Sequence, residues 1–130
     1  MKISVIVESY QSLMNLTKQN IPVTQMFELK KYVQNIKPEI DSYEEVRNAR
    51  VKELGEPILK EGKETGMYNI MPDNLETYNK DMAELKEKES EVKVPVIKQG
   101  ELLEHFKKLQ VPPTLTTADL IALEWLIIEG

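Results

Sequence analysis

The sequence of 130 residues contains no cysteine and only one histidine, His105. The absence of cysteine excludes disulfide bonds, thiol catalysis and cysteine-ligated zinc, and it fits a reducing compartment. A single histidine excludes a histidine-rich metal site, and a serine–histidine–aspartate triad would have to use His105. We expect this residue to lie on the surface of a short helix, without a catalytic role.

Glycine is also scarce, because the sequence has five glycines and they are dispersed along the chain. A phosphate-binding loop needs several glycines close together, so that the backbone can approach the phosphate. The sequence has no such loop, no Walker-type lysine and no dinucleotide-binding fingerprint. Its 22 Asp and Glu residues form charge runs that are typical of solvated helix faces. We therefore expect a protein that is not an enzyme and that needs no cofactor or metal.

Long apolar runs and strongly basic segments are missing too. Leu126 to Ile128 is an apolar run near the carboxyl terminus, and it is far shorter than the roughly 20 residues that span a bilayer. The net charge is -5, and no segment supplies the clustered Lys and Arg that track a nucleic-acid backbone. These observations predict a soluble, intracellular protein without a membrane partner and disfavour nucleic acid. The length predicts a single domain over residues 1–130.

The clearest pattern that is present predicts a long amphipathic helix. Its apolar positions alternate in spacings of four and three residues, as in a coiled-coil seam, and they are Leu29, Val33, Ile36, Ile40 and Tyr43. Pro38 lies inside this run, yet the heptad phase continues across it. We therefore predict one helix over about residues 23–54, bent near Pro38. Gly55 is expected to end this helix as a glycine cap.

Shorter elements are predicted on both sides of the long helix. In chain order they are a helix over 5–18 (a strand over 1–7 is the alternative), a β-hairpin over 56–72 with Gly62 and Gly66 in its turn, a helix over 74–89 capped by Asp73 and Glu76, a strand over 92–96, a helix over 101–109 and an apolar C-terminal helix capped by Thr116 and Asp119. We expect the strand over 92–96 to be able to pair with the hairpin.

These elements predict an α+β fold that is mainly helical. The long bent helix should pack on further helices, with its apolar seam facing the helix over 74–89. A small antiparallel hairpin, or a three-stranded sheet, should lie at one end. Residues 117–128 are apolar almost all round, so we expect this segment to be buried on more than one side, in the core or against a partner.

Four residues are candidates for an interface. Arg47 and Arg50 follow the apolar seam, where they either form ion pairs along their own helix or line the polar rim of an interface. Trp125 is the only tryptophan and lies in the apolar C-terminal segment with Ile128. Tryptophan is common in cores and in interface hot spots, so both environments stay open for Trp125. The same segment predicts self-association into a homo-oligomer.

The order of segments also resembles a known group of proteins. The relevant stretches are IPVTQMFELKKYVQNIKPEIDSYEEVRNARVKELGE, LETYNKDMAELKEKESEVKVPVI and LTTADLIALEWLIIE. Together they resemble small uncharacterised proteins encoded by tailed bacteriophages and prophages. This resemblance implies a phage origin and a long helix, a hairpin, a second helix, a valine-rich strand and an apolar C-terminal helix. It implies no activity and no functional residues.

The functional expectation is a non-enzymatic, phage-encoded protein that acts through protein–protein contacts. Its leading role is a virion component or an assembly adaptor, with a phage structural protein as partner. The alternative is an inhibitor that binds and blocks a host protein, and a small DNA-associated regulator is disfavoured by the acidic charge. The expected location is the host cytoplasm or the virion itself.

Overall fold

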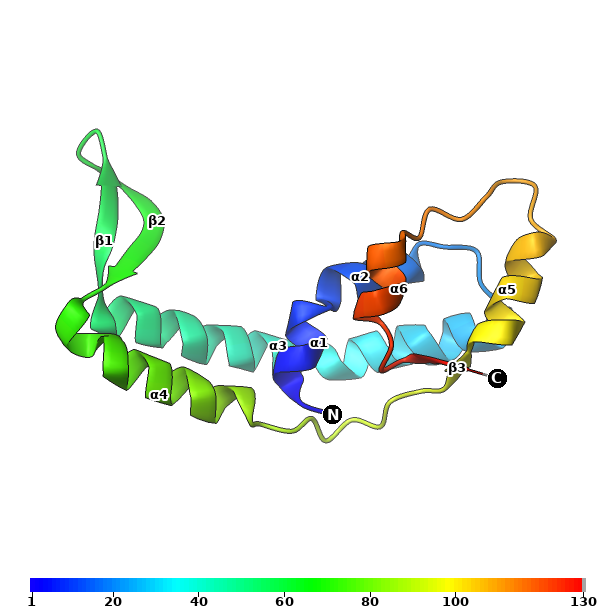
Figure 1. The fold of residues 1–130 in the computed structure, drawn as a ribbon, viewed down its shortest axis with the longest axis horizontal. Helices are drawn as coiled ribbons and strands as arrows, with labels where there is room; N and C mark the ends of the chain where they lie inside the picture. The colour runs from blue at the N-terminus through cyan, green and yellow to red at the C-terminus, as the bar shows by residue number, and fades with distance from the viewer. Residues whose placement is uncertain (130) are drawn as a thin grey trace.

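The computed structural model describes residues 1–129 and has an elongated shape (Figure 1). In chain order its elements are α1 (Ile3–Glu8), α2 (Tyr10–Thr17), α3 (Val23–Leu54), β1 (Gly55–Lys60), β2 (Lys63–Ile70), the 3-10 helix η1 (Pro72–Asn74), α4 (Leu75–Lys86), β3 (Ile97–Lys98), α5 (Gln99–Lys107), α6 (Thr117–Ala122) and β4 (Ile127–Ile128). The structure confirms the α+β, mainly helical class. Of the two predicted sheets, the structure contains the two-stranded hairpin and not the three-stranded sheet, because the described strands form two separate two-stranded sheets.

The molecule has two parts, which we name the body and the arm. The body contains α1, α2, the first half of α3 and the segments after residue 90. The arm comprises residues 44–86, with the hairpin at its far end (Figure 1). Helix α3 runs through both parts and spans the predicted residues without interruption across Pro38. Pro38 and Gln34 are both exposed, so water can reach the carbonyl that loses its hydrogen bond.

The hydrophobic core lies in the body, on one face of α3. Leu29, Ile36 and Ile40 of the predicted seam are each at most 2% exposed, and Tyr32 is 3% exposed. The other members of the core cluster come from both ends of the chain, and they are Ile6, Leu13, Leu16, Ile21, Ile97, Leu102, Leu123 and Leu126. The prediction that the seam faces the helix over 74–89 is therefore wrong for Leu29 to Ile40, whereas Tyr43, at the end of the seam, lines a hollow together with Leu85 of α4. Helices α1 and α2 and the C-terminal segments cover Leu29 to Ile40 instead.

The arm has little core of its own. Helix α4 lies beside the C-terminal half of α3 (Figure 1), where the Arg50 guanidinium and the Asp81 carboxylate form an ion pair at 3.0 Å. The structure describes every residue from 44 to 96, and none of them is fully buried. Half-buried side chains and polar contacts therefore hold the arm together.

Helix α4 begins and ends differently from the prediction. The expected Asp73 cap is wrong, because Pro72 starts a 3-10 turn and α4 begins at Leu75. The Asn74 side chain does not cap α4 and instead donates a hydrogen bond of 3.1 Å to the Leu54 carbonyl. This bond joins the start of α4 to the end of α3, so a tertiary contact replaces the local cap.

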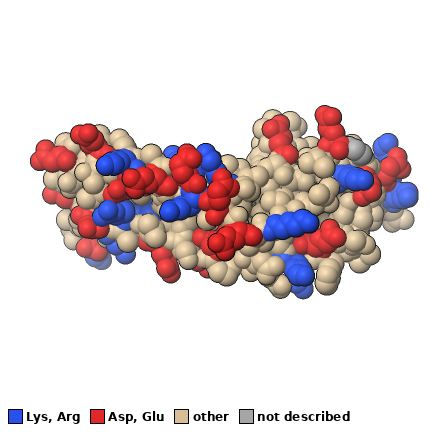
Figure 2. Space-filling model, turned by 90° about the horizontal axis from the view of Figure 1, so that it is seen from below, with Lys and Arg blue, Asp and Glu red and all other residues tan. Residues whose placement is uncertain are grey.

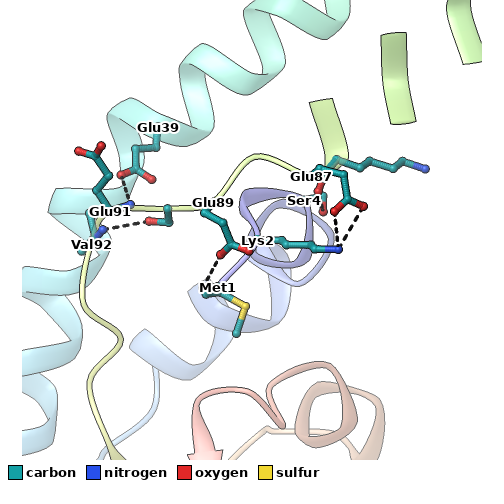
Figure 3. Close-up of polar contacts among 10 residues, drawn as sticks. Met1, Lys2, Ser4, Glu39, Glu87, Glu89, Glu91 and Val92 are labelled. Atoms are coloured by element: carbon teal, nitrogen blue, oxygen red, sulfur yellow. Dashed lines mark hydrogen bonds and ion pairs between the residues drawn. The ribbon is translucent and has the colours of Figure 1, made fainter. Parts of the chain in front are cut away.

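The end of α4 is fixed by the first residues of the chain (Figure 3). The amino group of Met1 lies 2.8 Å from a Glu89 carboxylate oxygen, and Lys2 Nζ lies 3.0 Å from Glu87. The Ser4 hydroxyl donates to the Lys86 carbonyl at 3.1 Å. These contacts hold residues 86–90 against α1, which explains why the helix stops at Lys86 rather than at 89.

The predicted hairpin is confirmed. Strands β1 and β2 are antiparallel and joined by Glu61 and Gly62, which have φ values of 53° and 77°. Two positive φ angles are what a tight two-residue hairpin loop requires. The prediction that Gly66 belongs to the turn is wrong, because Gly66 lies in β2, with a positive φ of 80°, opposite the irregular register between Pro57 and Leu59.

Gly55 is needed for a different reason from the one predicted. Its φ is -118°, so it is extended and is not a left-handed helix cap. A Cβ atom at this position would lie 2.7 Å from the Val51 carbonyl oxygen and 2.8 Å from that of Asn69. Glycine is therefore required by the close approach of α3 and β2 at this junction.

The C-terminal part corrects two further predictions. Residues 92–96 form no strand and do not join the hairpin; the following residues Ile97 and Lys98 pair in parallel with Ile127 and Ile128. The capping box of Thr116 and Asp119 is confirmed, but its helix ends at Ala122 rather than running to 128. The turn that follows places Leu123 and Leu126 in the core, where both are 0% exposed. Ile127 and Ile128 then form β4.

The first helix is confirmed over its strand alternative, with a break. Helices α1 and α2 meet at Ser9, whose hydroxyl donates to the Val5 carbonyl at 2.7 Å. A serine hydroxyl that bonds back to the preceding turn is typical of a bent or interrupted helix.

Candidate interaction surface

The two predicted interface arginines lie in the arm and make contacts within it. The Arg47 guanidinium lies 5.9 Å from the centre of the Tyr43 ring. Arg50 forms ion pairs with Glu53 on its own helix, at 2.9 Å, and with Asp81 of α4, at 3.0 Å. Arg50 therefore forms an ion pair along its own helix, as one of the two alternatives predicts, and a second pair with α4, whereas Arg47 contacts an aromatic ring.

Trp125 and Ile128 lie in the body. The Trp125 indole donates a hydrogen bond of 3.0 Å to the Ser9 hydroxyl, and its ring centre lies 6.1 Å from that of Tyr32. These contacts favour the core environment for Trp125, whereas Ile128 is 43% exposed. Tyr32 and Arg50 are separated by about 27 Å along α3, at 1.5 Å per residue. The structure therefore does not bring the four candidates together into one surface.

His105 lies in α5 and is half-buried. Its Nε2 atom lies 2.9 Å from the Asn20 side-chain oxygen. Among residues 1–129, no group of three or more His, Cys, Asp or Glu side chains is placed to hold a metal ion. Within the same residues, no helix combines the length and the apolar character needed to cross a membrane.

Charges on the arm are mixed in sign. On the face drawn in Figure 2, Asp and Glu side chains of the arm alternate with Lys and Arg, while the body shows a broader uncharged area. No extended basic patch is visible on this face.

An exposed apolar area lies where α3 begins. Val23, Met26 and Phe27 are 80%, 41% and 71% exposed, although all three are large apolar residues. They are adjacent on the helix surface because residues three and four apart share a face. Beside them is a groove of about 310 Å³ between α2 and α3, lined by Met14, Thr17, Ile21, Met26, Leu29, Lys30, Val33 and Gln34. We name this groove together with Val23 and Phe27 the α2–α3 surface.

The helical period explains why these side chains are exposed. The buried face of α3 contains Gln25, Leu29 and Tyr32, which point toward the core. Val23 and Phe27 lie more than 100° around the helix from Leu29, at 100° per residue, so the same packing turns them away from the core. Met26 and Val33 lie between the two faces and form the edge of the groove.

The charges around the α2–α3 surface are basic. Lys30 lines the groove, Lys31 follows it on α3, and Lys18 follows the end of α2. Within residues 1–129, the ion pairs involve none of these three lysines. Further along α3, Lys37 is neutralised by Asp41 at 2.7 Å, and this hydrogen bond raises the pKa of Lys37. Among residues 1–129, three of the thirteen Lys and Arg side chains outside ion pairs, Lys18, Lys30 and Lys31, therefore lie next to this surface in the sequence.

Sequence reasoning missed this surface although a signal for it exists. Val23 and Phe27 are large apolar residues that fall outside the seam of Leu29 and Ile36, so the core pattern does not account for them. An apolar residue at such a position, next to Lys30, indicates an exposed apolar face.

Comparison with protein-family models, curated proteins and solved structures found no match to this chain.

Proposed function

We propose that this chain is a non-enzymatic, phage-encoded interaction protein that acts as a virion component or an assembly adaptor. The observation that carries the proposal is the α2–α3 surface, on which Val23, Met26 and Phe27 present a contiguous apolar area to solvent. Contiguous apolar areas of this kind on soluble domains are typical of protein contact sites.

The energetics favour covering this surface. Complete removal of a Val, Met or Phe side chain from water contributes about 1.5–3 kcal/mol. Phe27 keeps 71% of its surface in solvent, so most of this contribution is unused in the isolated chain. A partner that covers Val23, Met26 and Phe27 together would gain it. Phe and Met are enriched at the centres of interfaces, so Phe27 and Met26 suit the centre of such a contact.

The elongated shape supports an adaptor role. The arm carries the hairpin away from the body, so the α2–α3 surface and the hairpin lie at opposite ends of α3 (Figure 1). A second contact at the hairpin end would let the chain engage two partners at once. The phage context rests on the resemblance of the sequence segments.

Cross-linking from the surface tests the proposal. A photo-reactive amino acid replaces Phe27 in cells that produce the phage, and cross-linked products are identified by mass spectrometry. The control carries the same group at Val111, which is 76% exposed and lies after α5. We expect a phage structural protein to be captured from position 27 and not from 111, and the chain to occur in purified particles.

Other outcomes contradict the proposal in distinct ways. Capture of one stoichiometric host protein, with no chain in particles, would instead support the inhibitor alternative. Equal capture from both positions would show that the α2–α3 surface is not a specific contact site.

A further inference from the structure

We propose that the α2–α3 surface binds an amphipathic helix of a partner protein whose polar flanks are acidic. This inference rests on the proposed function and goes further by stating the secondary structure and charge of the segment that is bound. The argument uses the walls of the groove, its length, and the charges beside it.

The walls of the groove favour a helix as the bound segment. Both walls are helices, α2 and α3, whose backbone groups bond within each helix. The groove is therefore lined by side chains such as Met14, Leu29 and Val33 and offers no free strand edge. An extended peptide would lose water from its backbone without finding partners here, whereas a helix satisfies its own backbone hydrogen bonds.

The length of the apolar area suits a short helical segment. From Val23 to Val33 the α3 face extends about 15 Å, which corresponds to roughly three turns of a bound helix. The groove of about 310 Å³ gives room for apolar side chains from such a helix. Met14 and Met26 are unbranched and flexible, so the walls can adapt to the shape of the side chains that enter.

The lysines beside the groove favour a bound helix that has acidic residues on both sides of its apolar stripe. Lys30 lines the groove, Lys31 lies one helical turn after Phe27 on α3, and Lys18 follows Thr17 of the α2 wall; within residues 1–129 none of the three belongs to an ion pair. Glu28 is the nearest acidic residue of α3, and it points about 100° away from Leu29 on the side opposite Lys30. A bound helix with Glu or Asp beside its apolar stripe would therefore meet opposite charges.

The concave shape of the groove favours a protein helix over a lipid bilayer as the bound partner. A bilayer interface is flat, so it could cover Val23 and Phe27 but would leave the groove at Met14 and Val33 unfilled. A helix can place side chains into the groove and cover the exposed residues at the same time. We therefore assign the surface to a protein helix.

The test uses the purified full chain and two synthetic helical peptides of about 18 residues, or five turns. They share one apolar stripe and differ only in their flanking positions, which are Glu in one peptide and Lys in the other. Binding is measured by fluorescence anisotropy of the labelled peptides. We expect the Glu peptide to bind at least about tenfold more tightly than the Lys peptide. The double variant Lys30→Glu, Lys31→Glu should reverse this order.

Methyl NMR locates the binding site in the same samples. The Met14 and Met26 methyl signals should shift on addition of the Glu peptide, while Met67, which is 65% exposed in the hairpin, serves as the control. The variant Phe27→Ser should weaken binding about tenfold or more, and because Phe27 is exposed this variant should fold normally. Circular dichroism checks its folding.

Several results would overturn the inference. They are equal binding of the two peptides, binding of neither, or shifts at Met67 in place of Met14 and Met26. Binding to vesicles of phosphatidylglycerol that Phe27→Ser abolishes, without binding of the Glu peptide, would assign the surface to lipid. A dimer in light scattering that Phe27→Ser dissociates would assign it to a second copy.

The peptide test and the cross-linking test can fail separately. If position 27 captures a phage protein but the peptides show no charge preference, the interaction function stands and the acidic helix is wrong. If the Glu peptide binds but position 27 captures no protein in cells, the surface chemistry is right and the proposed function is wrong.

Discussion

Trp125 donates a hydrogen bond of 3.0 Å to the Ser9 hydroxyl, although the two residues are 116 positions apart in the sequence. Ser9 lies at the junction of α1 and α2, and Trp125 lies in the turn between α6 and β4. The bond therefore connects the C-terminal segment to the N-terminal helices. Together with the contact between Trp125 and Tyr32, it makes the sole tryptophan a reporter of the core.

Replacing the acceptor tests this connection. We expect Ser9→Ala to lower the free energy of unfolding by about 1 kcal/mol, because the indole N–H loses its partner. The wild-type Trp125 emission should be blue-shifted, and urea denaturation followed by this emission gives the change in stability. If Ser9→Ala has the same free energy of unfolding as the wild type, the hydrogen bond contributes nothing to stability. A red-shifted emission at a monomeric mass would show that Trp125 is not part of the core.

Ile36 lies at the centre of the apolar face of α3 and is 0% exposed. Ile36→Asp should prevent folding, because an unpaired carboxylate would enter the core. The matched variant Ile36→Val should fold with a loss of about 0.5–1.5 kcal/mol. Circular dichroism melts compare the three proteins. An Ile36→Asp variant that melts like the wild type would show that this face of α3 is not the core.

The Tyr32 hydroxyl is buried and has no hydrogen-bond partner among residues 1–129. Burial, with a smaller effect of the Glu39 carboxylate, raises the pKa of Tyr32 to about 12. Because the folded state retains the phenolic proton, stability should fall as the pH rises from 10 toward 12, where the unfolded tyrosine ionises first. Absorbance at alkaline pH and urea denaturation measure both effects.

The variant Tyr32→Phe isolates this hydroxyl. It keeps the ring beside Trp125 and removes the polar atom, so we expect stability at neutral pH to be unchanged or to rise by about 1 kcal/mol. The loss of folding stability between pH 10 and 12 should be smaller in this variant than in the wild type. Marked destabilisation by Tyr32→Phe would reveal a hydrogen bond to the hydroxyl.

Asp119 connects α6 to α2. Its carboxylate accepts hydrogen bonds of 2.7 Å from the Ser12 hydroxyl and from the Asn15 amide, and it also accepts from the Thr116 backbone N–H. These bonds, that from Thr116 first, lower the pKa of Asp119 below its ordinary value of 3.8. The stabilising effect is thus present above pH 3.8 and is lost as the pH falls through the lower folded-state pKa.

The variant Asp119→Asn should be less stable than the wild type at pH 7. The difference should shrink as the pH falls below 3.8, because the wild-type carboxylate then takes up its proton. Urea denaturation at several pH values measures the difference, and an NMR titration of the carboxyl carbon gives the pKa. Thr116→Ala is the matched control, expected to lose about 1 kcal/mol through the cap without this acid dependence. A pH-independent difference for Asp119→Asn would contradict the assignment.

Local patterns in the sequence were sufficient for several elements. The spacing of Leu29, Ile36 and Ile40 identified α3 and its buried face, since a period near 3.6 residues is a property of one helix alone. Thr116 and Asp119 identified the start of α6, because both partners of a capping box lie within one turn. The glycines of residues 56–72 identified the hairpin.

Contacts between segments far apart in the sequence could not be predicted from local patterns. Helices α2 and α4 both carry apolar stripes, and periodicity does not tell which of them covers α3. The contacts of Ser4 and Lys2 with residues 86–87, and the two-residue pair of β3 with β4, depend on segments far apart in the chain. The same is true of Asn74, whose side chain bonds to Leu54 rather than capping its own helix. For the candidate surface, only Phe27 and Val23 outside the seam gave a local signal.

Helix α3 continues from the body to the hairpin without a break. Between Phe27 and Leu54 it covers about 40 Å, at 1.5 Å per residue. An unbroken helix changes length very little, so it acts as a spacer with a fixed pitch. Each residue inserted into its exposed arm half would move the hairpin by about 1.5 Å and rotate it by about 100° relative to the body. Separation and orientation of the two ends are therefore set together by the number of residues in one helix.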